Sequence, residues 1–216
     1  FNKAGISYAV LGTEESCSGD PAKRAGNEFL FQMQALSNIE VLNSYAIKKI
    51  VTACPHCFNT IKNEYPDLGG SYDVVHHSQL IDQLISEGKL KIKNDHFNGK
   101  KITYHDPCYL GRANGDYFAP RKVIKALKAE LKEMKSCKEK AMCCGAGGAQ
   151  MFKDSEKGNK EINIKRTEEA LETNSKIIAA ACPFCNTMLT DGVKSHENHK
   201  DIEIKDISEL VDKATD

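Results

Sequence analysis

The chain has 216 residues, 40% hydrophobic and 28% charged, and its 30 basic and 30 acidic side chains balance to a formal net charge of zero. This composition is typical of a globular protein, and the lack of a basic excess argues against a nucleic-acid partner. The sequence contains no apolar run long enough to predict a membrane-spanning helix.

The first half alternates between β-rich and helical patterns. Strands are predicted over 6–11, 49–53 and 72–76, and helices over 59–65 and 78–87. Another helix is expected to start at Pro21 with Asp20 as its cap, and helical structure then continues to about Ala46. The apolar positions that recur at helical spacing in this stretch are Phe29, Leu30, Met33 and Leu36.

A polar linker, 89–100, leads to a second half with the same alternation. Strands are predicted there over 102–105, 130–134, 176–181 and 202–205, and helices over 120–127, 161–171, 184–193 and 207–214. Alternating strands and helices favour an α/β fold with parallel sheets. Binding sites in such folds gather where the carboxyl ends of strands meet the following helices.

The nine cysteines are distributed unevenly. Five follow the pattern C-x34-C-C-x37-C-x2-C, namely Cys108, Cys143, Cys144, Cys182 and Cys185. An odd total in a chain of this length does not suit a secreted disulfide scaffold, and clustered thiols at strand ends suit metal ligation or redox chemistry in a reducing compartment. Cys137 stands alone in a lysine-rich stretch and is expected to be a core thiol.

An internal repeat relates the two halves. Residues 48–57 match residues 176–185, and each copy ends in a C-P-x-C sequence. Cys17 precedes the first copy's Cys54 by 37 positions, and Ser16 stands where the second copy has Cys143.

The counterpart of Cys108 in the first copy would fall about 19 residues before Phe1. We therefore expect a fragment with two units, 1–95 and 96–216, of which the first is truncated and the second complete.

Thiolates are soft ligands, and a C-x2-C turn lets two sulfurs face one site, so these cysteines suit Zn²⁺ or an iron–sulfur cluster. A closed zinc site uses four ligands. Because the second copy offers five, an unusual cluster or one thiol kept for chemistry is favoured. A structural zinc protein without a redox role, a thioredoxin-like dithiol and buried core thiols stay open as alternatives.

Residues beside the cysteines also have expected roles. Gly145, Gly147 and Gly148 leave room for the backbone to approach a cluster and to donate N–H groups to its sulfurs, which raises the reduction potential. His105 is a candidate proton relay because histidine titrates near neutral pH, and Arg112 is a candidate to balance thiolate charge. The other histidines at strand ends are expected to be surface or capping residues, namely His56, His76 and His77.

Three segments resemble the signatures of the cysteine-rich CCG domain of heterodisulfide reductases and related iron–sulfur oxidoreductases: His105–Arg112, Cys143–Gly148 and Ala181–Cys185. Residues 19–31 are similar to the branch of membrane-linked iron–sulfur reductases associated with electron-transfer flavoprotein and quinone. The resemblance covers essentially the whole chain. It implies two pseudo-symmetric, Rossmann-like CCG domains, the first truncated at its N-terminus.

The resemblance implies a noncubane [4Fe–4S] cluster on the five-cysteine set, with redox chemistry centred on Cys143 and Cys144. A second [4Fe–4S] cluster would involve Cys17, Cys54 and Cys57 when the first domain is intact. Ser16 departs from the family's paired cysteines, and an ordinary cubane suits that site better.

The resemblance further implies an iron–sulfur oxidoreductase that carries electrons from an electron-transfer flavoprotein or a ferredoxin-like domain. The acceptor would be a quinone, reached through a membrane segment outside this chain, or a disulfide. The expected location is the cytoplasmic face of the membrane. A relay that only passes electrons between partners is a further alternative.

Overall fold

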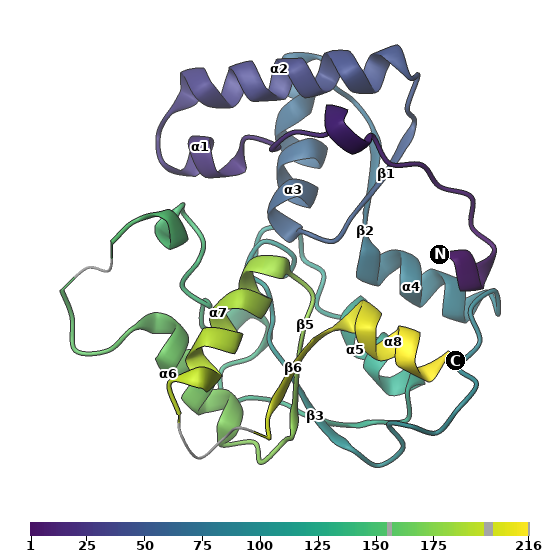
Figure 1. Ribbon diagram of the computed structural model, residues 1–216, viewed down its shortest axis with the longest axis vertical. Coiled ribbons are helices and arrows are strands. Elements are labelled where there is room, and N and C mark those ends of the chain that lie inside the picture. Colours follow the sequence, from purple (N-terminus) through teal and green to yellow (C-terminus); the bar gives the residue numbers. More distant parts are fainter. Residues whose placement is uncertain (155–156, 197–200, 216) are drawn as a thin grey trace.

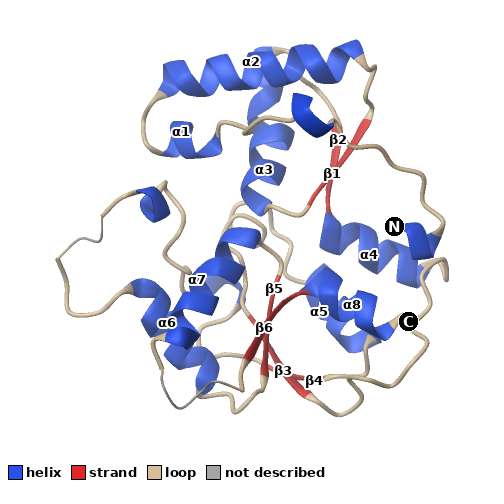
Figure 2. Cartoon of the chain, viewed as in Figure 1, coloured by secondary structure: helices blue, strands red, loops and turns tan. Residues whose placement is uncertain are grey.

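The computed structural model describes residues 1–154, 157–196 and 201–215, so the last residue of the second predicted unit, Asp216, lies outside the described residues. Within them the strands pair in parallel and form two sheets (Figure 2). The first sheet pairs β1 (Lys49–Thr52) with β2 (Asp73–His76). The second has the order β4 (Glu130–Lys132), β3 (Lys101–Tyr104), β5 (Ile177–Ala180) and β6 (Glu203–Asp206). The predicted α/β class with parallel sheets is confirmed.

The helices connect and cover these strands (Figure 1). They are α1 (Asp20–Arg24), α2 (Glu28–Ser44), α3 (Pro55–Asn59), α4 (His77–Ser86), α5 (Ala119–Ala126), α6 (Ile162–Leu171), α7 (Pro183–Lys194) and α8 (Ile207–Ala214). None of the described helices is both long and apolar enough to cross a membrane. The helix predicted over 59–65 begins earlier than expected, because Pro55 starts α3 and a π-helical turn, Thr60–Glu64, continues it.

The internal repeat is visible as a repeated order of elements. The order β1–α3–β2–α4 in the first half returns as β5–α7–β6–α8 in the second. In both halves the first cysteine of C-P-x-C caps the helix after the strand, and proline, which needs no N–H partner there, takes the first helical position. The repeat therefore places both C-x2-C pairs at equivalent ends of parallel strands.

Helix α2 buries a different face from the one expected. Its buried residues are Phe31, Ala35, Ile39 and Leu42, and three of them pack in a cluster with Tyr65. The predicted apolar positions are exposed, with Phe29 at 75% and Met33 at 54%. Both faces carry apolar residues at helical spacing, so the pattern predicts the helix but does not identify the buried face.

The strand predicted over 6–11 is wrong. No described strand pairs with this segment, and Tyr8 and Val10 are 54% and 76% exposed. In the second half, β4 lies at a similar position ahead of the cysteine pair and hydrogen-bonds only to β3. The described first half contains no strand that corresponds to β3, so the backbone of 6–11 has no edge to pair with.

One apolar cluster extends across both predicted units. It includes Phe58 and Leu84 from the first unit and Ile102, Ile124 and Leu210 from the second. Helix α4 packs against both α5 and α8, which carries the contact between the halves. Each sheet lies within one predicted unit, but the boundary between 1–95 and 96–216 stays a prediction.

Candidate metal centre

The two C-x2-C pairs meet where the halves join. Cys54 caps α3 and Cys182 caps α7, each directly after a strand of its own sheet. The two thiols are near neighbours, since hydrogen bonding to Cys182 is the largest cause that raises the pKa of Cys54 to about 12. Two separate sites were predicted, and the fold places parts of both in contact.

The contact continues through most of the other cysteines. Each thiol in one series of sulfurs lies near enough to the next to shift its pKa; the series is Cys108, Cys143, Cys144, Cys185, Cys182, Cys54 and Cys57. The influence of neighbouring thiols lowers the pKa of some cysteines in the series and raises that of others. Hydrogen bonds from neighbouring thiols lower the pKa of Cys143, and lower that of Cys182 to about 5. They raise the pKa of Cys144 to about 11.

All nine cysteines are free thiols, and two lie outside this series. Cys17 is exposed, although the Gly19 N–H points at its sulfur over 3.4 Å. Cys137 is half-buried and lies outside the buried core, so the expected core thiol is wrong.

The glycine loop supplies hydrogen-bond donors to the second cysteine set. The Gly145 N–H donates to Cys143 Sγ over 3.3 Å, and hydrogen bonds from the Gly145 and Gly147 amides act to lower the pKa of Cys143. Gly145 has φ +95°, a conformation that favours glycine, and a Cβ there would lie a tight 3.2 Å from Ile162 Cβ. Gly148 has no described contact with a sulfur.

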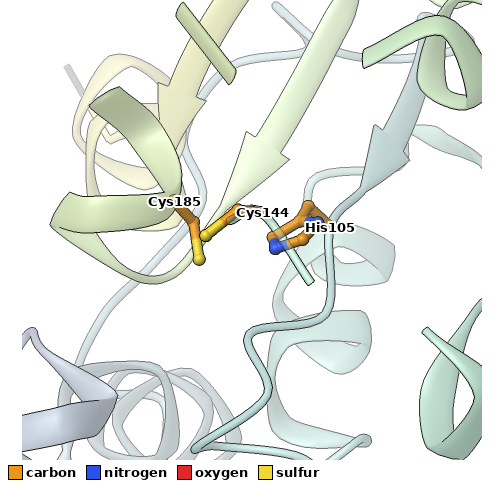
Figure 3. A group of neighbouring side chains, drawn as sticks. All are labelled: His105, Cys144 and Cys185. Atoms are coloured by element: carbon orange, nitrogen blue, oxygen red, sulfur yellow. The ribbon is translucent and has the colours of Figure 1, made fainter. Parts of the chain in front are cut away.

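His105 is buried beside the sulfurs at the end of β3. Its ligating nitrogen and the sulfurs of Cys144 and Cys185 all lie within 4.8 Å of one another. Figure 3 shows the two sulfurs side by side with the imidazole next to Cys144. Burial, followed by the charge of Arg166, lowers the pKa of His105 to about 3. These surroundings favour a neutral hydrogen-bonding imidazole over the predicted proton relay.

Arg112 lies near Cys108 in the five-cysteine set. Its Nη1 donates to the Ala141 carbonyl over 2.6 Å, just before the cysteine pair. Its charge opposes the larger effects, hydrogen bonding to Cys143 and burial, that raise the pKa of Cys108. The charge-balancing role of Arg112 stays a prediction.

A buried Asp20–His56 pair was not predicted. Asp20 Oδ2 lies 2.9 Å from His56 Nδ1, and Arg24 Nε donates to Asp20 Oδ1 over 3.1 Å. Burial alone would raise the pKa of Asp20, but the hydrogen bonds and charges of His56 and Arg24 outweigh it and lower that pKa. Asp20 is therefore the first residue of α1 and an ion-pair partner, and Gly19 takes the cap position.

His56 belongs to the first half, and its ring contacts aromatic residues of the second half. It stacks on Tyr109 with ring centroids 4.2 Å apart and meets Phe184 edge-on at 5.6 Å. Tyr109 follows Cys108, and Phe184 lies inside the second C-x2-C. The available sequence signal was the histidine inside the first C-x2-C, where the second copy has phenylalanine.

The donor set fits an iron–sulfur group. Soft thiolates converge with backbone N–H donors, and a buried imidazole and Arg112 lie beside them. Metal binding would displace the thiol protons. A single zinc ion would use four of these ligands and leave several sulfurs of the connected series without a role.

The chain belongs to the family of the cysteine-rich CCG domain, which matches residues 1–62 and 102–190. It is 44% identical over 220 residues to the EtfAB:quinone oxidoreductase of Syntrophomonas wolfei, covering 99% of this chain and 30% of that protein. It is 46% identical over 212 residues to FadF, a probable iron–sulfur-binding oxidoreductase of Bacillus subtilis, covering 98% and 30%.

A third relative belongs to the dihydromethanophenazine:CoB–CoM heterodisulfide reductase of Methanosarcina barkeri. The two chains are 38% identical over 225 residues, which covers 99% of this chain and 53% of the relative. The chain thus spans about a third to a half of these relatives. The relatives are named as iron–sulfur or quinone- and disulfide-linked oxidoreductases, so they favour the iron–sulfur interpretation over structural zinc.

Proposed function

We propose that this chain is the cluster-bearing part of an iron–sulfur oxidoreductase. It accepts electrons one at a time from a flavoprotein, such as an electron-transfer flavoprotein, or from a ferredoxin-like domain. It delivers two, together with two protons, to a quinone or to a disulfide. The proposal rests on the continuous series of thiols across both halves and on the names of the relatives.

The second cysteine set would hold the main cluster, which we propose to be a noncubane [4Fe–4S] group on Cys108, Cys143, Cys144, Cys182 and Cys185. When bound, the cluster supplies the one-electron redox step. The chain's residues bind it through thiolates, point Gly145 and Gly147 amides at Cys143, and exclude water by burying Cys144, Cys182 and Cys185. Donors to sulfur stabilise the more negative reduced state.

The first cysteine set lies within reach of the second. Cys54 and Cys57 extend the series of sulfurs, and the Ser18 hydroxyl donates to Cys57 Sγ over 3.4 Å. We propose a second [4Fe–4S] cluster here when the remaining ligands are supplied. Electrons would then pass between two adjacent centres.

The cellular location that we propose for the longer protein depends on its quinone acceptor. A quinone is a lipid-phase molecule, so we propose that the longer protein works at the cytoplasmic face of a membrane through segments outside this chain. None of the helices that the structure describes is long and apolar enough to span a membrane.

The experiment compares two cysteine variants of the anaerobically reconstituted chain. Reduced electron-transfer flavoprotein is mixed with wild type, Cys143→Ala or the control Cys137→Ala, and flavin reoxidation is followed with a short-chain naphthoquinone present. We expect wild type and Cys137→Ala to reoxidise flavin at similar rates. Cys143→Ala should be at least about tenfold slower, because losing a ligand costs more than losing an outer-shell contact. Equal rates for both variants would contradict the proposal.

A further inference from the structure

Arg166 is a fully buried arginine that touches no cysteine directly but hydrogen-bonds to His105. We propose that Arg166 is a positioning residue that holds His105 as the tautomer with its proton on Nε2, so that Nε2–H faces the sulfurs of Cys144 and Cys185 as a donor for a bound cluster. The tautomer is independent of any cluster, whereas its effect on redox potential rests on the proposed function.

The hydrogen bond between Arg166 and His105 fixes which ring nitrogen carries the proton. Arg166 Nε lies 2.9 Å from His105 Nδ1. A guanidinium has only donors, so Nδ1 must be the acceptor and carry no proton. A neutral imidazole with an unprotonated Nδ1 carries its proton on Nε2. This assignment follows from the chemistry of arginine, because the imidazole alone would allow either tautomer.

The other ring nitrogen of His105 faces the sulfurs. A ligating nitrogen of His105 lies within 4.8 Å of the sulfurs of Cys144 and Cys185. Since Nδ1 is engaged by Arg166, the nitrogen available to them is Nε2, and Figure 3 shows a ring nitrogen on the side of Cys144. His105 is 1% exposed, so water does not compete effectively for this proton.

Arg166 is held in place by its own hydrogen bonds. Its Nη1 donates to the Ser136 carbonyl over 2.8 Å and to Glu169 Oε2 over 2.6 Å. Glu169 in turn accepts from the Ser136 N–H. The buried positive charge is therefore paired, and the guanidinium is held at Nη1. These contacts leave Nε aimed at His105 as a fixed donor.

A donor to a ligand sulfur stabilises the reduced, more negative state of a cluster and raises its potential. Outer-shell groups that fix a histidine tautomer tune metal sites in the same way. Through His105, Arg166 would thus set the potential of the second cysteine set without contacting it.

The direct test is the tautomer in the metal-free protein under reducing conditions. Two-bond ¹H–¹⁵N correlation spectra at pH 7.5 distinguish the two nitrogens of His105, which is assigned by its loss in His105→Gln. We expect a single Nε2–H tautomer in wild type and in Arg166→Lys, because lysine also only donates. The double variant Arg166→Gln/Glu169→Gln, which leaves no unpaired charge, should show Nδ1–H or a mixture.

An Nδ1–H or doubly protonated His105 in wild type would overturn the proposal, even if the double variant does not fold.

The second readout is the midpoint potential of the reconstituted cluster at constant pH. His105→Phe should lower it, whereas His105→Gln, whose carbonyl accepts from Arg166 and whose amide donates to sulfur, should restore most of the difference. The exposed control His96→Phe should leave it unchanged. An unchanged potential in His105→Phe would contradict donation to the cluster, and failure to bind any cluster would contradict the proposed function while leaving the tautomer assignment intact.

Discussion

At the residue scale, one buried histidine has a protonation state set by its surroundings. His76 is fully buried, accepts a hydrogen bond as the cap of α4, and lies beside the backbone of the strands that deliver Cys54 and Cys182. Burial, followed by the charge of His77, lowers the pKa of His76 to about 3. The folded protein therefore keeps this imidazole neutral across the physiological range.

This burial predicts a pH dependence of stability. Below about pH 6.5 the unfolded state takes up a proton that folded His76 does not, so stability is complete above that pH and falls as pH drops toward 3. In metal-free protein, urea unfolding between pH 6 and 4 should show a slope smaller by up to about 1.4 kcal/mol per pH unit in His76→Asn, which keeps a capping side chain. Identical slopes for the two proteins would show that His76 is protonated in the fold.

The gathering of the cysteines at strand ends could be predicted because their spacing is local and repeated. The Asp20–His56 pair could not, since its two members are 36 positions apart and meet only when α1 packs against α3. The spacing also could not reveal that Cys54 and Cys182 touch, because that contact depends on how the two halves are placed together.

At the element scale, close packing of α6 on α7 supports the loop and helix that carry the second cysteine set. Gly192 lies within α7 and faces α6. A Cβ at this position would overlap Thr167 Oγ1 and approach the Asn163 carbonyl oxygen to 3.1 Å. The two helices are therefore closer than an alanine allows.

Gly192→Ala should destabilise the protein by about 1–3 kcal/mol through overpacking, although the same change in a free helix is stabilising. Guanidinium denaturation of the metal-free protein measures this. The exposed control on the same helix, Lys194→Ala, should change the free energy of unfolding little, and Thr167→Ala should recover part of the loss in the double variant. A stabilised Gly192→Ala would refute the close approach of α6 and α7.

Most elements could be predicted because apolar periodicity and capping residues are local signals. The exceptions depend on partners. The segment 6–11 has the composition of a strand but no neighbouring strand, and α2 has two apolar faces of which only that with Phe31 and Ala35 meets the core.

At the scale of the whole molecule, the two halves act as one scaffold for the cysteines. A common apolar cluster joins them, and His77 Nε2 of the first half lies 3.0 Å from Asp206 Oδ1 of the second. His77 begins α4 and Asp206 caps α8, so the contact joins two equivalent strand–helix junctions. This arrangement brings seven thiols into one connected series at the junction.

The central claim is that these thiols hold iron and sulfide for electron transfer. The most direct measurement is the iron, acid-labile sulfide and zinc content of the anaerobically prepared protein, with its visible spectrum before and after dithionite. We predict iron and sulfide in equal amounts and a broad thiolate-to-iron absorption that bleaches on reduction. A colourless protein with stoichiometric zinc and no sulfide would contradict the claim.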